Sequence, residues 1–255
     1  MAVHVHIVTP VVPTGLTSAS DFEGILGPED RITFQEIENG VPSVETELDE
    51  VLAAPETVAR AIEAEASGAD AVVIDCFCDP ALRAARECLT IPVLGPGETS
   101  MNMACILGHR FSVLSVTKNM SARFADKARV CGAWGSYVST RSVEVPVTEL
   151  SDARSDLDAK LLKAALLALA EDGADTLVLG CTGMLGLADT LSAALANEGW
   201  EVPVIDPIPI TIRLAKSLVD MRLSHSKRFL PRPTQKKISG FSHSAFEMLH
   251  KLRQD

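Results

Sequence analysis

Two stretches of the sequence decide the fold, because the second repeats the first. Residues 68–76 read GADAVVIDC and residues 173–181 read GADTLVLGC, an offset of 105 (181 minus 76) that aligns Cys76 with Cys181. A second pair follows in the same order, IPVLGP at 91–96 and VPVIDP at 202–207, at an offset of 111 (202 minus 91). Two repeats in one order indicate two halves of like topology. Each half is therefore predicted to present a cysteine at the end of an equivalent strand.

Short runs rich in β-branched residues alternate with longer helical patterns along the chain. The predicted strands are residues 5–9, 71–75, 111–117, 176–179 and 202–205, and the predicted helices are residues 55–67, 80–89, 157–171 and 186–197. This alternation is typical of an α/β fold with mostly parallel sheets. We predict two pseudo-symmetric lobes, with residues 1–107 plus 208–255 in lobe 1 and residues 108–207 in lobe 2. Because ligands of such sheets bind beyond the carboxyl ends of the strands, the active site is expected in the cleft between the lobes.

Composition narrows the class of protein. The 255 residues are 47% hydrophobic, 22% charged and only 4% aromatic, which suits a core of Ala, Val, Leu and Ile around buried parallel sheets. The net charge of -11 opposes phosphate backbones, so no nucleic-acid partner is expected. The most apolar stretch, residues 161–170, contains Lys163 and is about half of the ~20 residues that cross a bilayer. No membrane partner is expected either.

The cysteine count and the charge pattern bear on location and assembly. Six cysteines are too few for a disulfide scaffold and the N-terminus lacks the features of a signal peptide, so a cytoplasmic protein is predicted. Residues 14–50 form a loop-rich acidic insertion with Arg31 as their one basic residue, whereas the chain after Leu218 is mostly basic. A solvated surface is the simpler interpretation of the insertion. Pairing of the basic tail with an acidic neighbouring subunit is the alternative, and it would make the protein a homo-oligomer.

Cys76 and Cys181 are the candidate catalytic residues. Each follows a predicted strand and precedes a predicted helix start, where a helix N-terminus lowers the pKa of a thiol from ~8.5 and stabilises the thiolate. Two facing thiols, one ionised and one protonated, can remove a proton from one face of a carbon and return another to the opposite face. That chemistry is racemisation without a cofactor. Cysteines that only pack in a core are the alternative.

Proton abstraction next to a carbonyl also needs donors for the developing enolate oxygen. Backbone N–H groups after the two cysteines and the hydroxyls of Thr117 and Thr182 are candidates for this role. Thr9 and Pro10 end the first strand and point toward the same edge of the cleft, and Phe77 is a candidate for the wall of the pocket.

No metal or dinucleotide is predicted. Cys76 and Cys78 form a Cys-x-Cys, but no second pair or histidine lies at zinc spacing, and the six histidines form no cluster. Residues 95–98 (GPGE) are interpreted as a turn after a strand and lack a dinucleotide-binding pattern. The expected partner is a small-molecule substrate.

These residues resemble the aspartate/glutamate racemase superfamily and, within it, the hydantoin and allantoin racemase branch. GVPSVE at 40–45 is similar to the GPxSIE segment of that branch, CFCDPAL at 76–82 to its CFGDPxL segment, and LGCTGM at 179–184 to its second cysteine motif, which includes Gly183. The resemblance implies two flavodoxin-like lobes with the active site between them, and Cys76 and Cys181 as an acid/base pair on opposite faces of the substrate. It also implies independence from cofactors and a homo-oligomer.

Two departures from the branch bear on the substrate. Branch members carry an NPNTS stretch after the first strand, where this chain has TPVVPTG at 9–15, and Cys78 replaces a usual glycine. Because that loop helps to hold the polar groups of the substrate, its replacement leaves the identity of the substrate open.

The sequence therefore predicts a cofactor-independent racemase for a 5-substituted hydantoin, allantoin or a similar compound with an acidic stereocentre beside a carbonyl. An amino-acid racemase and a maleate-type cis-trans isomerase remain alternatives within the superfamily. A decarboxylase of the arylmalonate type is disfavoured, because that chemistry keeps a single cysteine at the second position. A two-lobed small-molecule binding protein with packing cysteines is the alternative from a different class.

Overall fold

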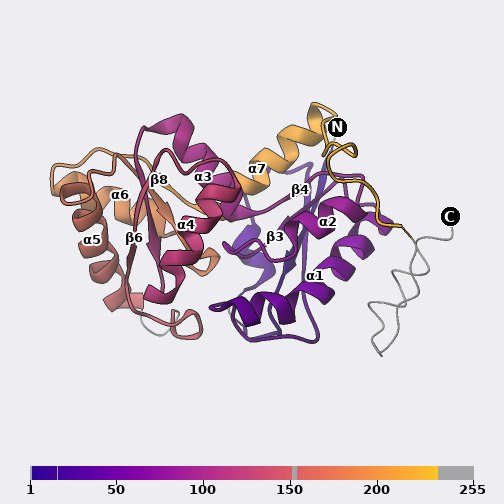
Figure 1. The fold of residues 1–255 in the computed structure, drawn as a ribbon, viewed down its shortest axis with the longest axis horizontal. Helices are drawn as coiled ribbons and strands as arrows, with labels where there is room; N and C mark the ends of the chain where they lie inside the picture. The colour runs from indigo at the N-terminus through magenta and orange to yellow at the C-terminus, as the bar shows by residue number, and fades with distance from the viewer. Residues whose placement is uncertain (1, 16, 151–153, 235–255) are drawn as a thin grey trace.

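The protein consists of two lobes, each built on a four-stranded parallel sheet (Figure 1). This computed structural model describes residues 2–15, 17–150 and 154–234. In the first sheet the order is β2-β1-β3-β4, with β1 His4–Thr9, β2 Arg31–Glu36, β3 Ala71–Ile74 and β4 Val93–Leu94. In the second sheet the order is β6-β5-β7-β8, with β5 Phe111–Ser115, β6 Tyr137–Ser142, β7 Thr176–Leu179 and β8 Val204–Ile205.

The strand register confirms the repeat seen in the sequence. In the first sheet Val73 of β3 pairs with Ile7 of β1, and in the second sheet Val178 of β7 pairs with Val113 of β5. All four residues of β3 and all four of β7 are buried, as expected for central strands with a neighbour on each side. The two halves therefore share one topology, and Cys76 and Cys181 follow equivalent central strands.

Helices cover both faces of each sheet. On the first sheet, α1 Glu47–Ala66 and α2 Leu82–Cys88 pack on one face and α7 Pro207–Asp220 on the other. On the second sheet, α5 Arg154–Ala170 and α6 Leu187–Asn197 pack on one face, and α3 Pro96–Leu107 and α4 Ser121–Val130 on the other. Helix α3 also packs against α7, so these two helices join the lobes (Figure 1). The lobe boundaries at residues 107/108 and 207/208 stay a prediction.

Several elements differ from the sequence-based expectation. The acidic stretch 14–50, predicted to be rich in loops, contains the unpredicted strand β2, and β6 was missed as well. Both are edge strands whose residues are mostly half-buried, so they lack the continuous apolar run of a central strand. Helices α3, α4 and α7 were also missed. The turn expected at residues 95–98 is wrong, since α3 begins at Pro96.

Two predicted helix starts are also wrong. Helix α1 begins at Glu47 rather than at residue 55, and the Thr46 side chain caps it by accepting from the Asp49 N–H at 3.2 Å. Helix α2 begins at Leu82 rather than at Pro80, because Asp79 and Ala81 adopt the left-handed region with φ of 51° and 58°. The chain thus makes a tight turn between Cys76 and the helix.

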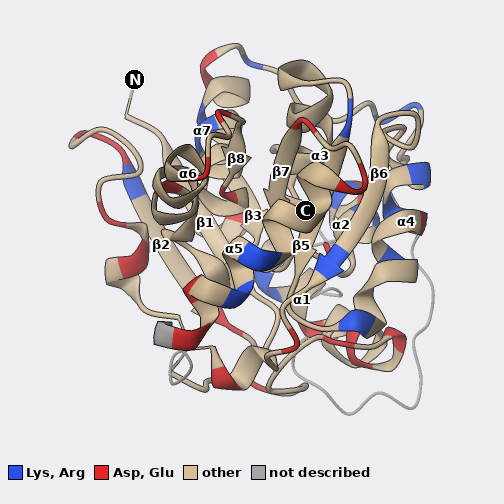
Figure 2. Cartoon of the chain, turned by 90° about the vertical axis from the view of Figure 1, so that its left-hand side faces the viewer, with Lys and Arg blue, Asp and Glu red and all other residues tan. Residues whose placement is uncertain are grey.

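Figure 2 marks the positions of the basic and acidic residues along the ribbon, and both signs occur on helices of each lobe, for example on α1 and α5. Part of the predicted basic tail, including Lys236, Lys237, Lys251 and Arg253, lies outside the described residues. Within the described part, Lys227 donates to main-chain carbonyls at the end of α2, and His225 Nε2 accepts from the Val93 N–H at 2.8 Å. This part of the tail therefore packs on its own chain. None of the helices that the structure describes is long and apolar enough to cross a membrane.

Candidate active site

A cavity of about 90 Å³ lies where the carboxyl ends of both sheets meet. Residues at or just after the ends of β1, β3, β5 and β7 contribute to its lining, among them Thr9, Cys76, Val116 and Cys181. Because two central strands end at the same cavity, the fold brings together two cysteines that are 105 positions apart (181 minus 76) in the sequence.

Most of the predicted site residues line this cavity. Thr9, Cys76 and Phe77 come from the first lobe, and Cys181, Thr182 and Gly183 come from the second. Pro10 and Thr117 are not among the lining residues: Thr117 precedes a 3-10 turn, and its buried hydroxyl has no hydrogen-bond partner among the residues that the structure describes. Their roles in binding stay predictions.

The environment of Cys181 corrects one expectation. A lowered pKa was predicted for both thiols, but burial raises the pKa of Cys181 to about 12, although the Gly183 N–H donates to its sulfur and opposes the shift. Only a three-residue 3-10 turn, Thr182–Met184, follows Cys181, and α6 begins later at Leu187. Burial therefore outweighs the helix terminus, and Cys181 is a protonated thiol near neutral pH.

Cys76 has a different neighbour. The buried Cys78 thiol donates a hydrogen bond to the Cys76 sulfur, and this contact, together with burial, raises the pKa of Cys78 well above its usual value. An S–H donor stabilises negative charge on the sulfur that accepts it. Cys76 therefore has a hydrogen-bonding thiol beside it.

The sequence repeat makes the difference between the lobes explicit. At the offset of 105, Asp75 corresponds to Gly180 and Cys78 corresponds to Gly183. A Cβ at Gly180 would lie 2.6 Å from Val113 Cγ1 and 3.0 Å from the Leu114 carbonyl, so the second lobe has no room for a side chain there. The two thiols thus occupy equivalent backbone positions in unlike surroundings.

Asp75 is a cavity residue that the sequence analysis missed. Its Oδ2 accepts a hydrogen bond from Thr9 Oγ1 at 3.1 Å, whereas its buried Oδ1 has no partner among the described residues. Burial raises the pKa of Asp75 to about 6, against the hydrogen bonds from Thr182 and Thr9. A carboxylate that ends an otherwise apolar run, next to the candidate acid/base residue Cys76, is the signal in the sequence that could have identified it.

Two further segments contribute residues to the lining of the cavity. Pro42, Ser43 and Val44 belong to the GVPSVE segment and come from the loop before α1, while Val147 and Leu150 come from the loop after β6. The sequence analysis used the first segment only as a family marker and did not select these residues as site residues. Their contribution depends on chain folding over long sequence distances, which local patterns do not reveal.

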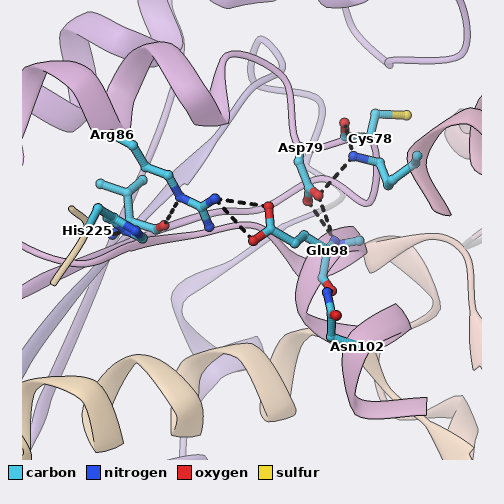
Figure 3. Close-up of polar contacts among 9 residues, drawn as sticks. Cys78, Asp79, Arg86, Glu98, Asn102 and His225 are labelled. Atoms are coloured by element: carbon cyan, nitrogen blue, oxygen red, sulfur yellow. Dashed lines mark hydrogen bonds and ion pairs between the residues drawn. The ribbon is translucent and has the colours of Figure 1, made fainter. Parts of the chain in front are cut away.

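The loop that carries Cys76 and Cys78 is anchored by Asp79 (Figure 3). Asp79 accepts hydrogen bonds from the N–H groups of Gly97 (2.9 Å) and Glu98 (2.8 Å) at the start of α3, and from Lys127 Nζ (2.9 Å) on α4. Lys127 also donates to the Cys78 carbonyl at 2.7 Å. The carboxylate does not cap α2, whose N-cap Ala81 has no side-chain hydrogen bond. It ties the cysteine loop to two other helices instead.

The glycines around α3 allow this close approach. A Cβ at Gly95 would collide with the Asp79 side chain, and a Cβ at Gly97 would collide with the Phe77 carbonyl. Arg86 of α2 adds a second connection, since it donates to both carboxylate oxygens of Glu98 at 3.0 and 3.1 Å (Figure 3). The cysteine loop therefore packs directly against the GPGE segment at the start of α3.

The charge of the cavity limits what it binds. Its ionisable lining residues are Asp75, Cys76, Cys78 and Cys181, and no Lys, Arg or His is among the described residues that line it. In the described part of the chain, no group of three or more His, Cys, Asp or Glu side chains is placed to hold a metal ion. A larger cavity of about 370 Å³ on the other side of the Cys78 loop has mixed charge and contains neither Cys76 nor Cys181.

Comparison with known proteins identifies relatives of this chain. A family model described as Asp/Glu/Hydantoin racemase matches residues 19–215. A curated hydantoin racemase from Rhizobium meliloti is 33% identical over 88% of this chain and 92% of its own length. Among solved structures, an allantoin racemase from Klebsiella pneumoniae superimposes with a TM-score of 0.88 at 30% identity, covering 96% of this chain and 99% of that one. An allantoin racemase from Pseudomonas fluorescens gives a TM-score of 0.85 at 27% identity, covering 93% and 100%.

Proposed function

Because the chain belongs to the Asp/Glu/hydantoin racemase family and is a racemase, we propose that it inverts the stereocentre of a neutral cyclic ureide, a 5-substituted hydantoin or allantoin, with Cys76 and Cys181 as its acid/base pair. The observation that carries the proposal is the position of both thiols on one cavity, each after the central strand of its own sheet. The chemistry needs only protein groups, so no cofactor is part of the proposal.

The proposed reaction moves one proton off the substrate and another proton on. The Cys76 thiolate takes the proton from the stereocentre, and the electron pair of the C–H bond delocalises onto the adjacent carbonyl as an enolate. The Cys181 thiol then delivers its proton to the opposite face of the same carbon. At the end Cys76 is a thiol and Cys181 is a thiolate, and the opposite enantiomer is processed by the reverse sequence.

The environment of Cys181 supports this order. Burial raises the pKa of Cys181 to about 12, which keeps it a proton donor near neutral pH. Cys76 has the Cys78 thiol as its neighbour instead, so the two cavity thiols differ in their surroundings.

The charge of the cavity favours a neutral substrate. Hydantoin and allantoin racemases are the similar proteins, and their named substrates carry ring N–H groups and no carboxylate. An aspartate, a glutamate or a maleate would bring two carboxylates into a cavity whose ionisable described lining residues are Asp75 and three cysteines, with no basic side chain among them. Like charges at such short range disfavour binding. The amino-acid racemase and the maleate isomerase are thus the weaker alternatives.

The proposal is tested by hydrogen exchange with the solvent. Single enantiomers of a 5-substituted hydantoin, allantoin and aspartate, together with the achiral maleate, are incubated in D₂O with the wild type, Cys76→Ser, Cys181→Ser and the control Cys105→Ser. The Cys105 thiol is exposed and does not line the cavity. We expect the wild type and the control to exchange and invert a hydantoin or allantoin. Because a serine hydroxyl is a far weaker acid than a thiol, both cavity variants should lose inversion.

The same experiment separates the competing functions. Each cavity variant retains one thiol, so it should exchange the hydrogen of one enantiomer more than that of the other. Inversion that survives both substitutions would refute the two-thiol mechanism. Ligand binding without any exchange by the wild type would instead favour the small-molecule binding protein. A cytoplasmic location and a homo-oligomeric assembly remain predictions from the sequence.

A further inference from the structure

Asp75 carries a buried carboxylate oxygen that no described residue satisfies. The residue follows β3 and lines the active-site cavity. Thr9 donates to Oδ2, and the Thr182 hydroxyl also acts to lower the pKa of this carboxyl, but the buried Oδ1 has no hydrogen-bond partner among the described residues. Polar atoms in protein interiors are almost always paired, because an unpaired one loses its hydration without compensation. The donor that Oδ1 lacks is therefore expected from a molecule in the cavity.

The place of Asp75 connects it to the reacting carbon. Asp75 directly precedes Cys76 in the sequence. The pKa of Cys181 is raised mainly by burial, then by the charge of Cys76, and then by the charge of Asp75. The carboxylate therefore lies near both sulfurs, between which the proposed mechanism places the stereocentre. Gly180 occupies the equivalent position in the other lobe, so the cavity has this acceptor on one side only.

We infer that Asp75 is a substrate-binding residue whose Oδ1 accepts a hydrogen bond from an N–H attached to the reacting carbon. This inference rests on the proposed function, because it requires a stereocentre held between the two thiols. It narrows the substrate class to neutral cyclic amides with a ring N–H next to the stereocentre, the N1–H of a hydantoin. A ring without that N–H leaves Oδ1 unpaired and binds less well.

The charge of Asp75 gives binding a pH limit. Burial raises its pKa to about 6, and the charges of Asp21 and Asp206 act in the same direction. Cys76, Cys78 and Cys181 are the other ionisable groups that face it in the cavity. Above pH 6 the carboxylate is ionised and accepts the N–H strongly; below pH 6 it is protonated and accepts it weakly. The KM for a hydantoin should therefore rise as the pH falls through 6.

The test compares the wild type, Asp75→Asn and the control Asp21→Asn on single enantiomers of a 5-substituted hydantoin and its N1-methyl and N3-methyl derivatives. Asp21 is exposed and lies outside the cavity, but its charge acts on Asp75, so the control makes the same charge change at a distance. We expect Asp75→Asn to raise the KM of the hydantoin and of the N3-methyl derivative roughly 10- to 100-fold, the range for a hydrogen bond to a charged group. The control should stay within about twofold.

Two further readouts isolate the hydrogen bond. For the N1-methyl derivative, the wild type and Asp75→Asn should have equal KM or, without turnover, equal inhibition constants. The rise of KM below pH 6 should disappear in Asp75→Asn and persist in Asp21→Asn. Equal KM values of the wild type and Asp75→Asn for the unmethylated hydantoin would overturn the inference. It would also be overturned if the difference in KM between these two proteins disappeared for the N3-methyl derivative and persisted for the N1-methyl derivative.

Failure of the proposed function is distinguishable from failure of this inference. Calorimetric titration of the hydantoin into the inactive Cys76→Ser/Cys181→Ser double variant, with and without Asp75→Asn, measures binding without turnover. Weaker binding with Asp75→Asn supports the assignment even if the acid/base roles are wrong. Exchange by the wild type with no change in affinity on Asp75→Asn would refute the assignment and leave the racemase intact.

Discussion

Replacing Asp79 by Asn should destabilise the protein far more than an ordinary charge change. The Asp79 side chain is 2% exposed and accepts from Lys127 Nζ and from two backbone N–H groups at the start of α3. Burial alone would lower the pKa of Lys127, but the Asp79 carboxylate outweighs burial and raises it. Asn keeps the shape and tolerates the left-handed backbone at φ 51°, so the substitution removes charge and one acceptor with little added strain.

The magnitude follows from what is left behind. In Asp79→Asn the Lys127 ammonium keeps only the Cys78 carbonyl as an acceptor within this cluster, and the new amide NH₂ faces groups that are themselves donors. Breaking a buried ion pair in this way costs about 3 to 5 kcal/mol of unfolding free energy. For a chain of this size that is a fall in Tm of roughly 6 to 20 °C. Lys127→Met should cost less, about 1 to 3 kcal/mol, because Asp79 keeps its two backbone donors. The double variant should cost less than the sum of the two.

The assay is thermal and urea unfolding followed by circular dichroism, with Asp126→Asn as the matched control. Asp126 also pairs with a basic residue of α4, Arg129, at 2.6 Å, but both side chains are exposed, so its loss should cost about 0 to 1 kcal/mol. If Asp79→Asn destabilises the protein no more than Asp126→Asn does, the argument that the buried pair holds the cysteine loop is refuted. Fully additive effects of Asp79→Asn and Lys127→Met would refute the claim that the two residues act as a unit.

Three other predictions follow from the site. Gly180→Ala should destabilise the protein by about 1 to 3 kcal/mol, since its Cβ would lie 2.6 Å from Val113, whereas Gly135→Ala, with open space around it, should be near neutral in urea unfolding. Cys78→Ala should lower kcat about tenfold through loss of the S–H donor to Cys76, with Cys105→Ala as the control in the same exchange assay, and an unchanged kcat would count against that role. Because burial raises the folded pKa of Asp75 to about 6 from an unfolded value of 3.8, this group stabilises the fold below pH 4 and loses that stabilisation between pH 4 and 6. The free energy of unfolding of the wild type relative to Asp75→Asn should therefore fall by about 2 to 3 kcal/mol from pH 4 to pH 7, and a constant difference would argue against a buried carboxylate.

The sequence predicted the centre of each lobe better than its edges. The repeated GAD stretches revealed β3 and β7, because central parallel strands are continuous apolar runs that end in a chemically distinctive residue. Strands β2 and β6 carry polar, half-buried residues, and no local pattern separates such edge strands from loops. Helix α3 was missed because its GPGE start has the composition of a turn, and only the approach of Asp79 explains its two glycines.

In the candidate site, too, some features could be predicted from the sequence and others could not. Cys76 and Cys181 could be predicted because each follows a recognisable strand, and they line one cavity. The raised pKa of Cys181 could not be predicted, since it depends on how the rest of the chain covers the thiol. Asp75 was missed for the same reason: a carboxylate at the end of a strand is exposed in most folds, and only the packing of two lobes buries this one.

The unlike surroundings of the two thiols have a consequence for how the enzyme would treat mirror images. Enantiomers of a compound with a single stereocentre have equal free energies, so the equilibrium constant of racemisation is unity and kcat/KM must be identical in the two directions. The Asp75 and Cys78 side chains beside one thiol, against Gly180 and Gly183 beside the other, cannot bias the final mixture. These side chains can give the two enantiomers different kcat and KM values while the ratio kcat/KM stays the same. They can also make the isotope effect on C–H cleavage differ between the two enantiomers. The asymmetry of the protein would thus be visible in rates of approach to equilibrium and never in its position.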